Sequence, residues 1–132
     1  MRLTVRADGA APIDLVRARY SVPAQWPSWA PPIRRVDCSA EVLGVGVTGT
    51  VFGVIPNVGA QFEVVELFPE ESRWAWDVSA GRVRMHLDHR SESRIGGGTS
   101  TALVIDGPAA AVMTYAPIAR LTLESLVRPP KR

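Results

Sequence analysis

Between residues 45 and 105 the sequence alternates between strand-forming segments and short turn signals, and this pattern constrains the fold most. In the segment 73–78, Trp74, Trp76 and Val78 recur at every second position, which is the period of a half-buried β-strand. Parallel strands need long crossover connections, whereas every connection here is short, so the strands are predicted to pair in antiparallel fashion. The expected strands are Val45–Ile55, Gln61–Phe68, Arg73–Val78, Val83–Glu92 and Thr99–Ile105.

Glycine and proline mark the connections between these strands. Pro56-Asn57 is a turn signal, and Gly96-Gly97-Gly98 is typical of a hairpin connection. Because neither connection can hold a helix, the region is expected to be an antiparallel meander.

Helical periodicity is confined to the two ends of the chain. Residues 2–8 alternate as a first strand, and residues 12–20 form a short amphipathic helix that a second short helix follows. Residues 33–38 fit another strand. Residues 109–128 return to helical spacing, and Pro117 is expected to break or kink this last helix. The order predicts an α+β fold, with the terminal helix packed on the concave face of a curled sheet.

Several segments, taken in order, carry a resemblance to a known family. They are the stretch YSVPAQWPSW at 20–29, the stretch FEVVELFP at 62–69 with Trp74-Ala75-Trp76 behind it, the glycine hairpin, and Tyr115-Ala116-Pro117. Together they resemble the START-type helix-grip superfamily (SRPBCC), which includes polyketide cyclases and dehydratases. The resemblance implies a curved antiparallel sheet of six to seven strands wrapped on a C-terminal helix, with two short helices between the first two strands. It also implies a cavity between sheet and helix.

Composition fits one globular domain that covers residues 1–132. Hydrophobic residues make up 46% and charged residues 21%, so disorder is not expected. The single cysteine, Cys38, cannot form an internal disulfide, which favours a reducing, cytoplasmic location. The sequence has no apolar run of membrane-spanning length and no apparent signal peptide. The net charge of +2 is scattered, which argues against a nucleic-acid partner.

Trp26 and Trp29 stand in a segment that proline interrupts repeatedly. A large indole in such a connection is more often a core residue than a ligand contact. We expect both side chains to close one end of the sheet-and-helix cup, each with an N–H group that finds a partner.

Two sequence patterns resemble functional motifs but do not predict the corresponding sites. Gly44–Gly49 spells the dinucleotide fingerprint, but a strand pattern follows it where that fingerprint requires a helix. His86, Asp88 and His89 resemble metal ligands, yet His89 lies on the opposite strand face, and two ligands are too few for zinc. His86 and Asp88 are therefore expected on a solvated face, and neither a metal nor another cofactor is predicted.

Two titratable residues are candidates for acid–base chemistry in the cavity. His89 shares strand parity with Met85 and Leu87, so it either acts as a general acid or base or makes a hydrogen bond at the pocket rim. Glu66 shares parity with Phe62, and a carboxyl group in an apolar pocket would have a raised pKa. A β-bulge in this segment would reverse the facing of Glu66.

The remaining candidates are apolar side chains expected to face the cavity and contact a ligand. They are Phe52, Phe62, Val64, Trp74, Trp76, Met85, Leu87, Leu103 and Ile105. Three functions remain open. The first is binding of a small hydrophobic ligand, such as a lipid, aromatic or polyketide-like molecule, by a monomer or homodimer. The second is a cyclase- or dehydratase-like enzyme that uses His89 and Glu66. The third is a protein-interaction module.

Overall fold

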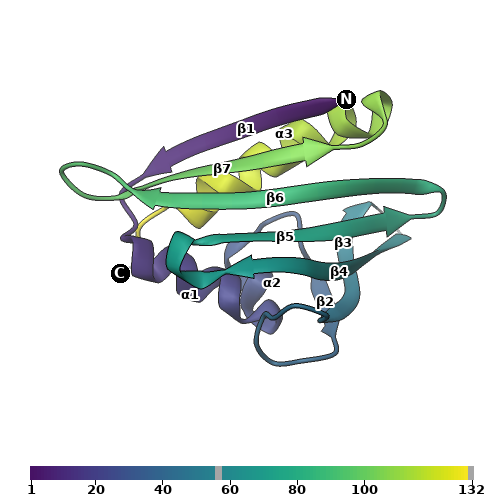
Figure 1. The fold of residues 1–132 in the computed structure, drawn as a ribbon, viewed down its shortest axis with the longest axis horizontal. Coiled ribbons are helices and arrows are strands. Elements are labelled where there is room, and N and C mark those ends of the chain that lie inside the picture. Colours follow the sequence, from purple (N-terminus) through teal and green to yellow (C-terminus); the bar gives the residue numbers. More distant parts are fainter. Residues whose placement is uncertain (56–57, 131–132) are drawn as a thin grey trace.

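A computed structural model describes residues 1–55 and 58–130. Seven strands form one antiparallel sheet with the order β1-β7-β6-β5-β4-β3-β2, and the helices lie on one side of it (Figure 1). The strands are β1 (Arg2–Gly9), β2 (Arg35–Cys38), β3 (Thr48–Ile55), β4 (Val58–Phe68), β5 (Arg73–Ala80), β6 (Val83–Ser93) and β7 (Thr99–Asp106).

The predicted meander is confirmed from β3 to β7. Each of these strands pairs with its neighbour in sequence, and the only helical turn among their described residues is the three-residue 3₁₀ turn η2 (Pro69–Glu71). At the glycine hairpin, Gly96, Gly97 and Gly98 all have positive φ angles, which side chains rarely adopt. The predicted turn at Pro56-Asn57 lies outside the described residues.

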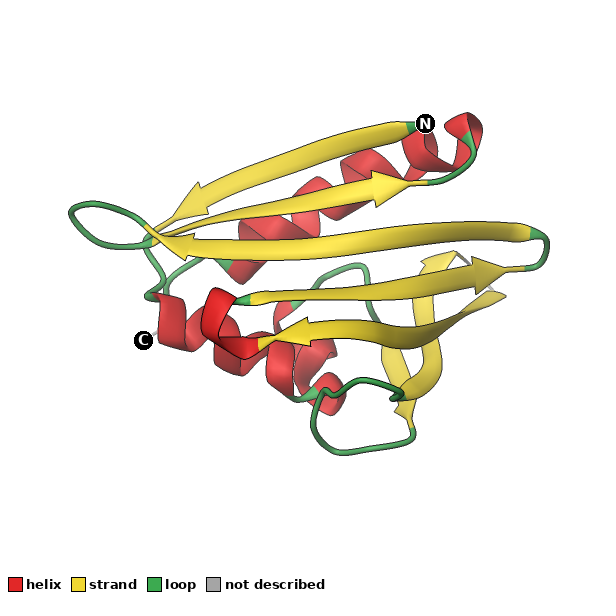
Figure 2. Ribbon diagram, in the orientation of Figure 1, coloured by secondary structure: helices red, strands yellow, loops and turns green. Residues whose placement is uncertain are grey.

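Short helices connect the first two strands, as predicted. They are α1 (Ile13–Ser21), the 3₁₀ turn η1 (Pro23–Gln25) and α2 (Trp26–Trp29) (Figure 2). Helix α3 (Ala109–Leu126) packs against β1 and β7. The structure corrects the expected break at Pro117, because α3 continues through it. Pro117 is exposed, so water can bond the carbonyl that its missing N–H leaves free.

Arg19 joins α1 to the end of α3. Its guanidinium Nη1 donates to the backbone oxygens of Leu126 at 2.7 Å and Arg128 at 2.6 Å, with Ser125 at 3.3 Å. The last carbonyls of a helix have no partner within the helix, and a cation also complements the negative end of the helix dipole. The Arg19 side chain thus links α1 to the C-terminal end of α3.

Two strand irregularities decide which side chains face inward. In β4 the register passes from Val64 opposite Trp76 to Glu66 opposite Ala75, so Val65 is an extra, bulged residue. In β3 the register shifts between Val51 and Ile55, around Gly53 with φ of 113°. Beyond each irregularity, simple alternation no longer gives the facing of a side chain.

Candidate functional site

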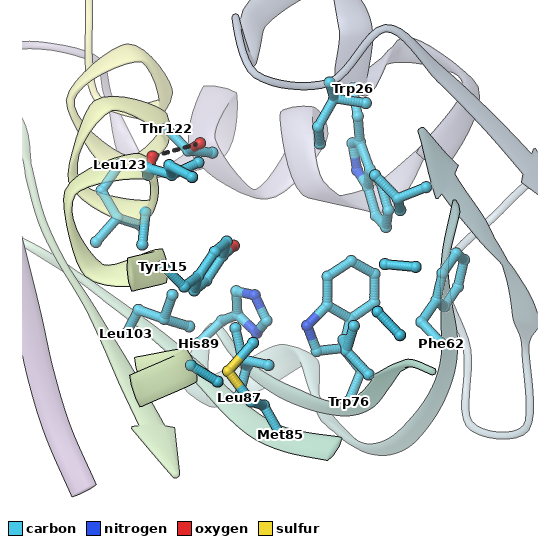
Figure 3. A pocket seen from close by; sticks show the side chains of 18 of the residues that line it. Trp26, Phe62, Trp76, Met85, Leu87, His89, Leu103, Tyr115, Thr122 and Leu123 are labelled. Atoms are coloured by element: carbon cyan, nitrogen blue, oxygen red, sulfur yellow. Dashed lines mark hydrogen bonds between the residues drawn. The ribbon is translucent and has the colours of Figure 1, made fainter. Parts of the chain in front are cut away.

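A cavity of about 410 Å³ lies between the concave face of the sheet and the helices α2 and α3 (Figure 3). Its wall is almost wholly apolar and aromatic. Residues along β3 to β7 form the floor, and α3 and the Trp26–Ile33 segment form the cover. The lining residues are Tyr20, Trp26, Trp29, Ile33, Val51, Ala60, Phe62, Trp74, Trp76, Val78, Ala80, Val83, Met85, Leu87, His89, Leu103, Ala110, Ala111, Thr114, Tyr115, Ile118, Ala119, Thr122 and Leu123.

Cross-strand rows build the cavity floor. Residues directly opposite each other in an antiparallel pair share a face, and here Trp74 stands opposite His89, which stands opposite Leu103. The next row places Trp76 opposite Leu87. Because β5 and β6 pair without a bulge, the alternation along each strand carries these side chains onto the concave face together.

Trp26 and Trp29 close one end of the cavity with their N–H groups bonded. Trp26 Nε1 donates to the backbone oxygen of Tyr20, and Trp29 Nε1 donates to that of Arg19, both at 3.0 Å. Trp26 is buried and Trp29 half-buried. The structure confirms the expectation that each indole closes this end and finds a partner.

Trp74 and Trp76 differ from the first pair. Both side chains are buried, but neither indole Nε1 has a hydrogen-bond partner among the described residues. Their rings lie 5.1 Å apart in an edge-to-face arrangement. A buried donor without an acceptor costs roughly 1–3 kcal/mol, so this strand carries a local energetic penalty at the cavity.

His89 is held flat against Trp74. The two ring centroids lie 3.7 Å apart with an interplanar angle of 3°, and His89 Nδ1 donates to the backbone oxygen of Trp74 at 3.2 Å. Burial lowers the pKa of His89 to about 3, which outweighs the opposite influence of that hydrogen bond. The imidazole is therefore neutral at physiological pH, and its Nε2 is the nitrogen that can accept a hydrogen bond.

Two tyrosines add neutral hydroxyl groups. Burial raises the pKa of Tyr115 to about 12 and also raises the pKa of Tyr20, so both phenols stay protonated. In Figure 3 the Tyr115 oxygen points into the open space of the cavity.

Charged residues occupy the opposite face of the sheet. Asp88 accepts from Arg73 Nε at 3.1 Å and from Arg90 Nη2 at 2.9 Å. Burial acts to raise the pKa of Asp88, but these bonds outweigh it and hold the pKa below its usual value. His86 Nδ1 lies 2.6 Å from Asp77 Oδ1. The structure thus corrects one expectation: Asp88 is on the outer face but buried by its arginine partners, whereas His86 is partly exposed.

Within residues 1–55 and 58–130, no group of three or more His, Cys, Asp or Glu side chains is placed to hold a metal ion. In the same residues, no helix combines the length and the apolar character needed to cross a membrane.

Solved structures with the same arrangement of elements identify the fold. A protein from Nitrosospira multiformis superposes with a TM-score of 0.80 at 16% identity, and Ara h 8.0201 with 0.76 at 10% identity. Ginseng major latex-like protein 151 from Panax ginseng gives 0.72 at 14% identity. Each alignment covers 96% of this chain and 94% of the other. The chain has the START-type helix-grip fold. No protein-family model and no curated protein sequence matches it.

The observed fold confirms the expected helix-grip architecture, and most of the predicted residues lie at the cavity. Phe62, Trp74, Trp76, Met85, Leu87, Leu103 and His89 line it. Val64 and Ile105 lie on the same concave face, opposite Trp76 and Leu87 respectively, but they are fully buried in the core and do not line the cavity.

Two predicted placements in the helix-grip cavity are wrong. Phe52 does not line it. Val51 does, while the Phe52 ring lies under the Arg35 guanidinium, 4.2 Å from centroid to Cζ. Glu66 also lies off the cavity, because the bulge at Val65 pairs it with Ala75 on the outer face. For Glu66 the physical reason is the bulge at Val65, which reverses the facing of the residues that follow it. Phe52 follows the inward-facing Val51 in the strand, so its side chain lies on the opposite face of the sheet.

The terminal helix was predicted as the cover of the cavity, but the residues of that helix that line it were not named. Ala111, Tyr115, Ile118 and Thr122 line it at helical spacings of three and four along α3. This periodicity is present in the sequence and could have identified them. Nothing comparable could have identified Tyr20 or Ile33, since both depend on how the short helices turn.

Proposed function

We propose that this protein binds a small hydrophobic molecule in the cavity between the sheet and α3. The observation that carries the proposal is the cavity itself, about 410 Å³ in volume and lined by aromatic and aliphatic side chains with few polar groups. Cavities of this size and character are typical of small-molecule sites. The helix-grip fold supports the proposal, since START-type proteins generally enclose such a cavity.

An acid–base enzyme is the weaker candidate. Of the two predicted catalytic groups, Glu66 lies on the outer face and His89 alone lines the cavity. A histidine with a pKa of about 3 is a poor proton acceptor at neutral pH, because efficient general bases have a pKa near the working pH. Binding therefore accounts for the geometry better than catalysis does.

Mass spectrometry of small molecules that copurify with the native protein tests the proposal directly. The complementary test is a titration with 1-aminoanthracene, a neutral aromatic whose fluorescence rises in apolar surroundings. We expect saturable binding to the folded protein and none to the unfolded protein. Absence of binding to the folded protein would refute the proposed function.

A matched pair of variants locates the probe. Val78→Trp adds an indole inside the cavity, whereas Ser79→Trp adds the same group on the outer face of β5. Filling the cavity should weaken 1-aminoanthracene binding by about tenfold or more, and the outer variant should change it less than about twofold. Ala111→Trp on α3 is a second blocking variant, and thermal unfolding checks that each variant folds. Equal effects of the inner and outer variants would place the probe elsewhere.

A further inference from the structure

A second hollow of about 240 Å³ lies outside the cavity, where α1 meets the end of β4, the η2 turn and the loop of residues 39–47. Figure 1 shows α1 beside the turn that joins β4 to β5. Tyr20 and Trp74 line both this hollow and the cavity, and their rings meet edge to face with centroids 5.2 Å apart. These two side chains form a wall between the hollows, so the second hollow is a separate site.

The loop over the second hollow is fixed at both of its ends. Leu43 N donates to the backbone oxygen of Ser21, at the end of α1, at 2.8 Å. Gly46 N donates to the backbone oxygen of Val64 in β4, also at 2.8 Å. Leu43 is buried, whereas Val42 beside it is 60% exposed at the rim. The hollow is therefore formed in the folded chain without a ligand, as small-molecule sites usually are.

The lining of the second hollow is mostly apolar. Helix α1, the loop, β4, the η2 turn and β5 each contribute to it. The apolar residues are Val16, Val42, Leu43, Leu67, Pro69 and Trp74. The favourable free energy of transfer from water to such a lining grows with each methylene group that is buried. The hollow therefore favours an aliphatic chain.

Two arginines, Arg17 and Arg73, also line the second hollow, and no Asp or Glu among the described residues does. Arg17 Nε donates to Ser72 Oγ at 2.5 Å, and Arg73 Nε donates to Asp88 Oδ1 at 3.1 Å. Their side chains are 47% and 30% exposed. Each guanidinium is thus held through Nε, and its terminal nitrogens can reach a group at the rim of the hollow.

Four carboxylates lie near these guanidiniums but outside the lining of the second hollow. They are Asp14, Glu66, Glu71 and Asp88. Asp88 is shared with Arg90, whose Nη2 it accepts from at 2.9 Å. Asp14 is 91% exposed and lies 3.7 Å from Arg17 Nη1, and an exposed pair of this kind contributes little. A further carboxylate could therefore pair with the arginines, and it suits the planar guanidinium well.

We propose that the second hollow binds a small amphipathic acid, that is, a short aliphatic chain with one carboxylate. The chain lies among the apolar residues, and the carboxylate pairs with Arg17, with Arg73 as the second cation. The main cavity offers no such cation, because no Arg or Lys among the described residues lines it. The proposal concerns a different site from the proposed function, so either can fail without the other.

Matched probes separate the charged contact from burial of the chain. Octanoate and octanamide have nearly the same shape, but only octanoate carries a negative charge. We expect octanoate to bind the wild-type protein about tenfold more tightly than octanamide, as measured by calorimetric titration. Butanoate keeps the charge and shortens the chain, so it should bind at least about tenfold more weakly than octanoate.

The backbone amide signals of the wild-type protein locate the probe. In a ¹⁵N–¹H spectrum, octanoate should move the signals of Val42, Leu43 and Ser72 in a saturable manner, because these residues line the second hollow. The signals of Ala111 and Ile118, which line the main cavity from α3, should move little.

Variants then assign the contact to residues. Arg17→Gln should weaken octanoate binding by about tenfold and remove most of its preference over octanamide. Arg6→Gln is the matched control, because it removes the same charge from the exposed side of β1 and should change binding less than about twofold. Val42→Asp places a carboxylate at the rim on an exposed position and should also weaken octanoate binding by about tenfold or more. Thermal unfolding checks that each variant folds.

The outcomes distinguish this site from the cavity of the proposed function. Equal affinities for octanoate and octanamide, equal effects of Arg17→Gln and Arg6→Gln, or shifts confined to residues of the main cavity would overturn the second site. Failure of octanoate to bind, with 1-aminoanthracene still bound, would also overturn it and leave the proposed function intact. Octanoate binding at the second hollow without any binding of 1-aminoanthracene would support this site and refute the proposed function alone.

Discussion

The protein holds two pairs of tryptophans around one cavity, and the two pairs satisfy their polar groups differently. Trp26 and Trp29, on the short helix α2, donate to backbone oxygens at 3.0 Å. Trp74 and Trp76, on strand β5, donate to no described residue. Residue type and burial alone do not separate a structural tryptophan from a candidate binding tryptophan. The two pairs differ in whether the indole N–H has a partner within the described residues.

The difference follows from what each backbone leaves free. The acceptors of the first pair, Arg19 and Tyr20, lie in the last turn of α1, where carbonyls lack partners within the helix. A strand inside a sheet uses its carbonyls in the ladder on both sides. Indoles beside a helix end can therefore be bonded locally, whereas indoles on an inner strand depend on other groups.

Trp26→Ala should give the largest effect, because it removes a fully buried indole together with its hydrogen bond. We expect a loss of roughly 3–5 kcal/mol in the free energy of unfolding, measured by urea denaturation. A variant as stable as the wild type would show that Trp26 is not part of the structural pair.

Around the strand pair Trp74 and Trp76, the free energy of unfolding should depend on pH through His89, which is stacked on Trp74. The folded pKa of about 3 lies below the unfolded value near 6.5, so the unfolded state takes up the proton first. The stabilising contribution is complete above pH 6.5 and is lost as the pH falls toward 3, by up to about 1.4 kcal/mol per pH unit.

Urea unfolding between pH 6.5 and 4.5 measures this slope before Asp88, whose pKa is lowered, takes up protons. His89→Gln should flatten the curve in this window. An unchanged slope in the variant would mean that His89 is not the group responsible.

Trp76→Ala tests the binding role of the second pair. It should weaken 1-aminoanthracene binding by about tenfold, because the indole borders the cavity. Asp77→Asn is the neighbouring control, since Asp77 lies on the outer face beside His86 and should leave binding within about twofold. If both substitutions weaken binding equally, the cavity is not where the probe binds.

The sequence predicted those parts of the fold and site that depend on uninterrupted periodicity. In β5 and β6, simple alternation correctly placed Trp74, Trp76, Leu87 and His89 on the concave face. Consecutive strand patterns joined by short connections similarly predicted the antiparallel meander. Both features are local, and local patterns survive folding when no irregularity intervenes.

The remaining details could not be predicted because they depend on pairing between distant segments. The bulge at Val65 is a property of two strands in register, and the letters of one strand do not specify it. The unpaired state of the Trp74 and Trp76 N–H groups likewise depends on what every neighbouring element offers. Only three-dimensional contacts reveal such an absence.

The bulge in β4 also has a consequence for how this chain could acquire new chemistry. With Val65 accommodated as an extra residue, Leu67 stands opposite Trp74 and Glu66 faces outward. A regular strand with the same residues would exchange them and place the Glu66 carboxylate over Trp74, close to His89. One residue of register thus decides whether an apolar side chain or a carboxylate lies beside Trp74. A change in how β4 pairs would therefore alter the charge beside Trp74 without any change in residue type.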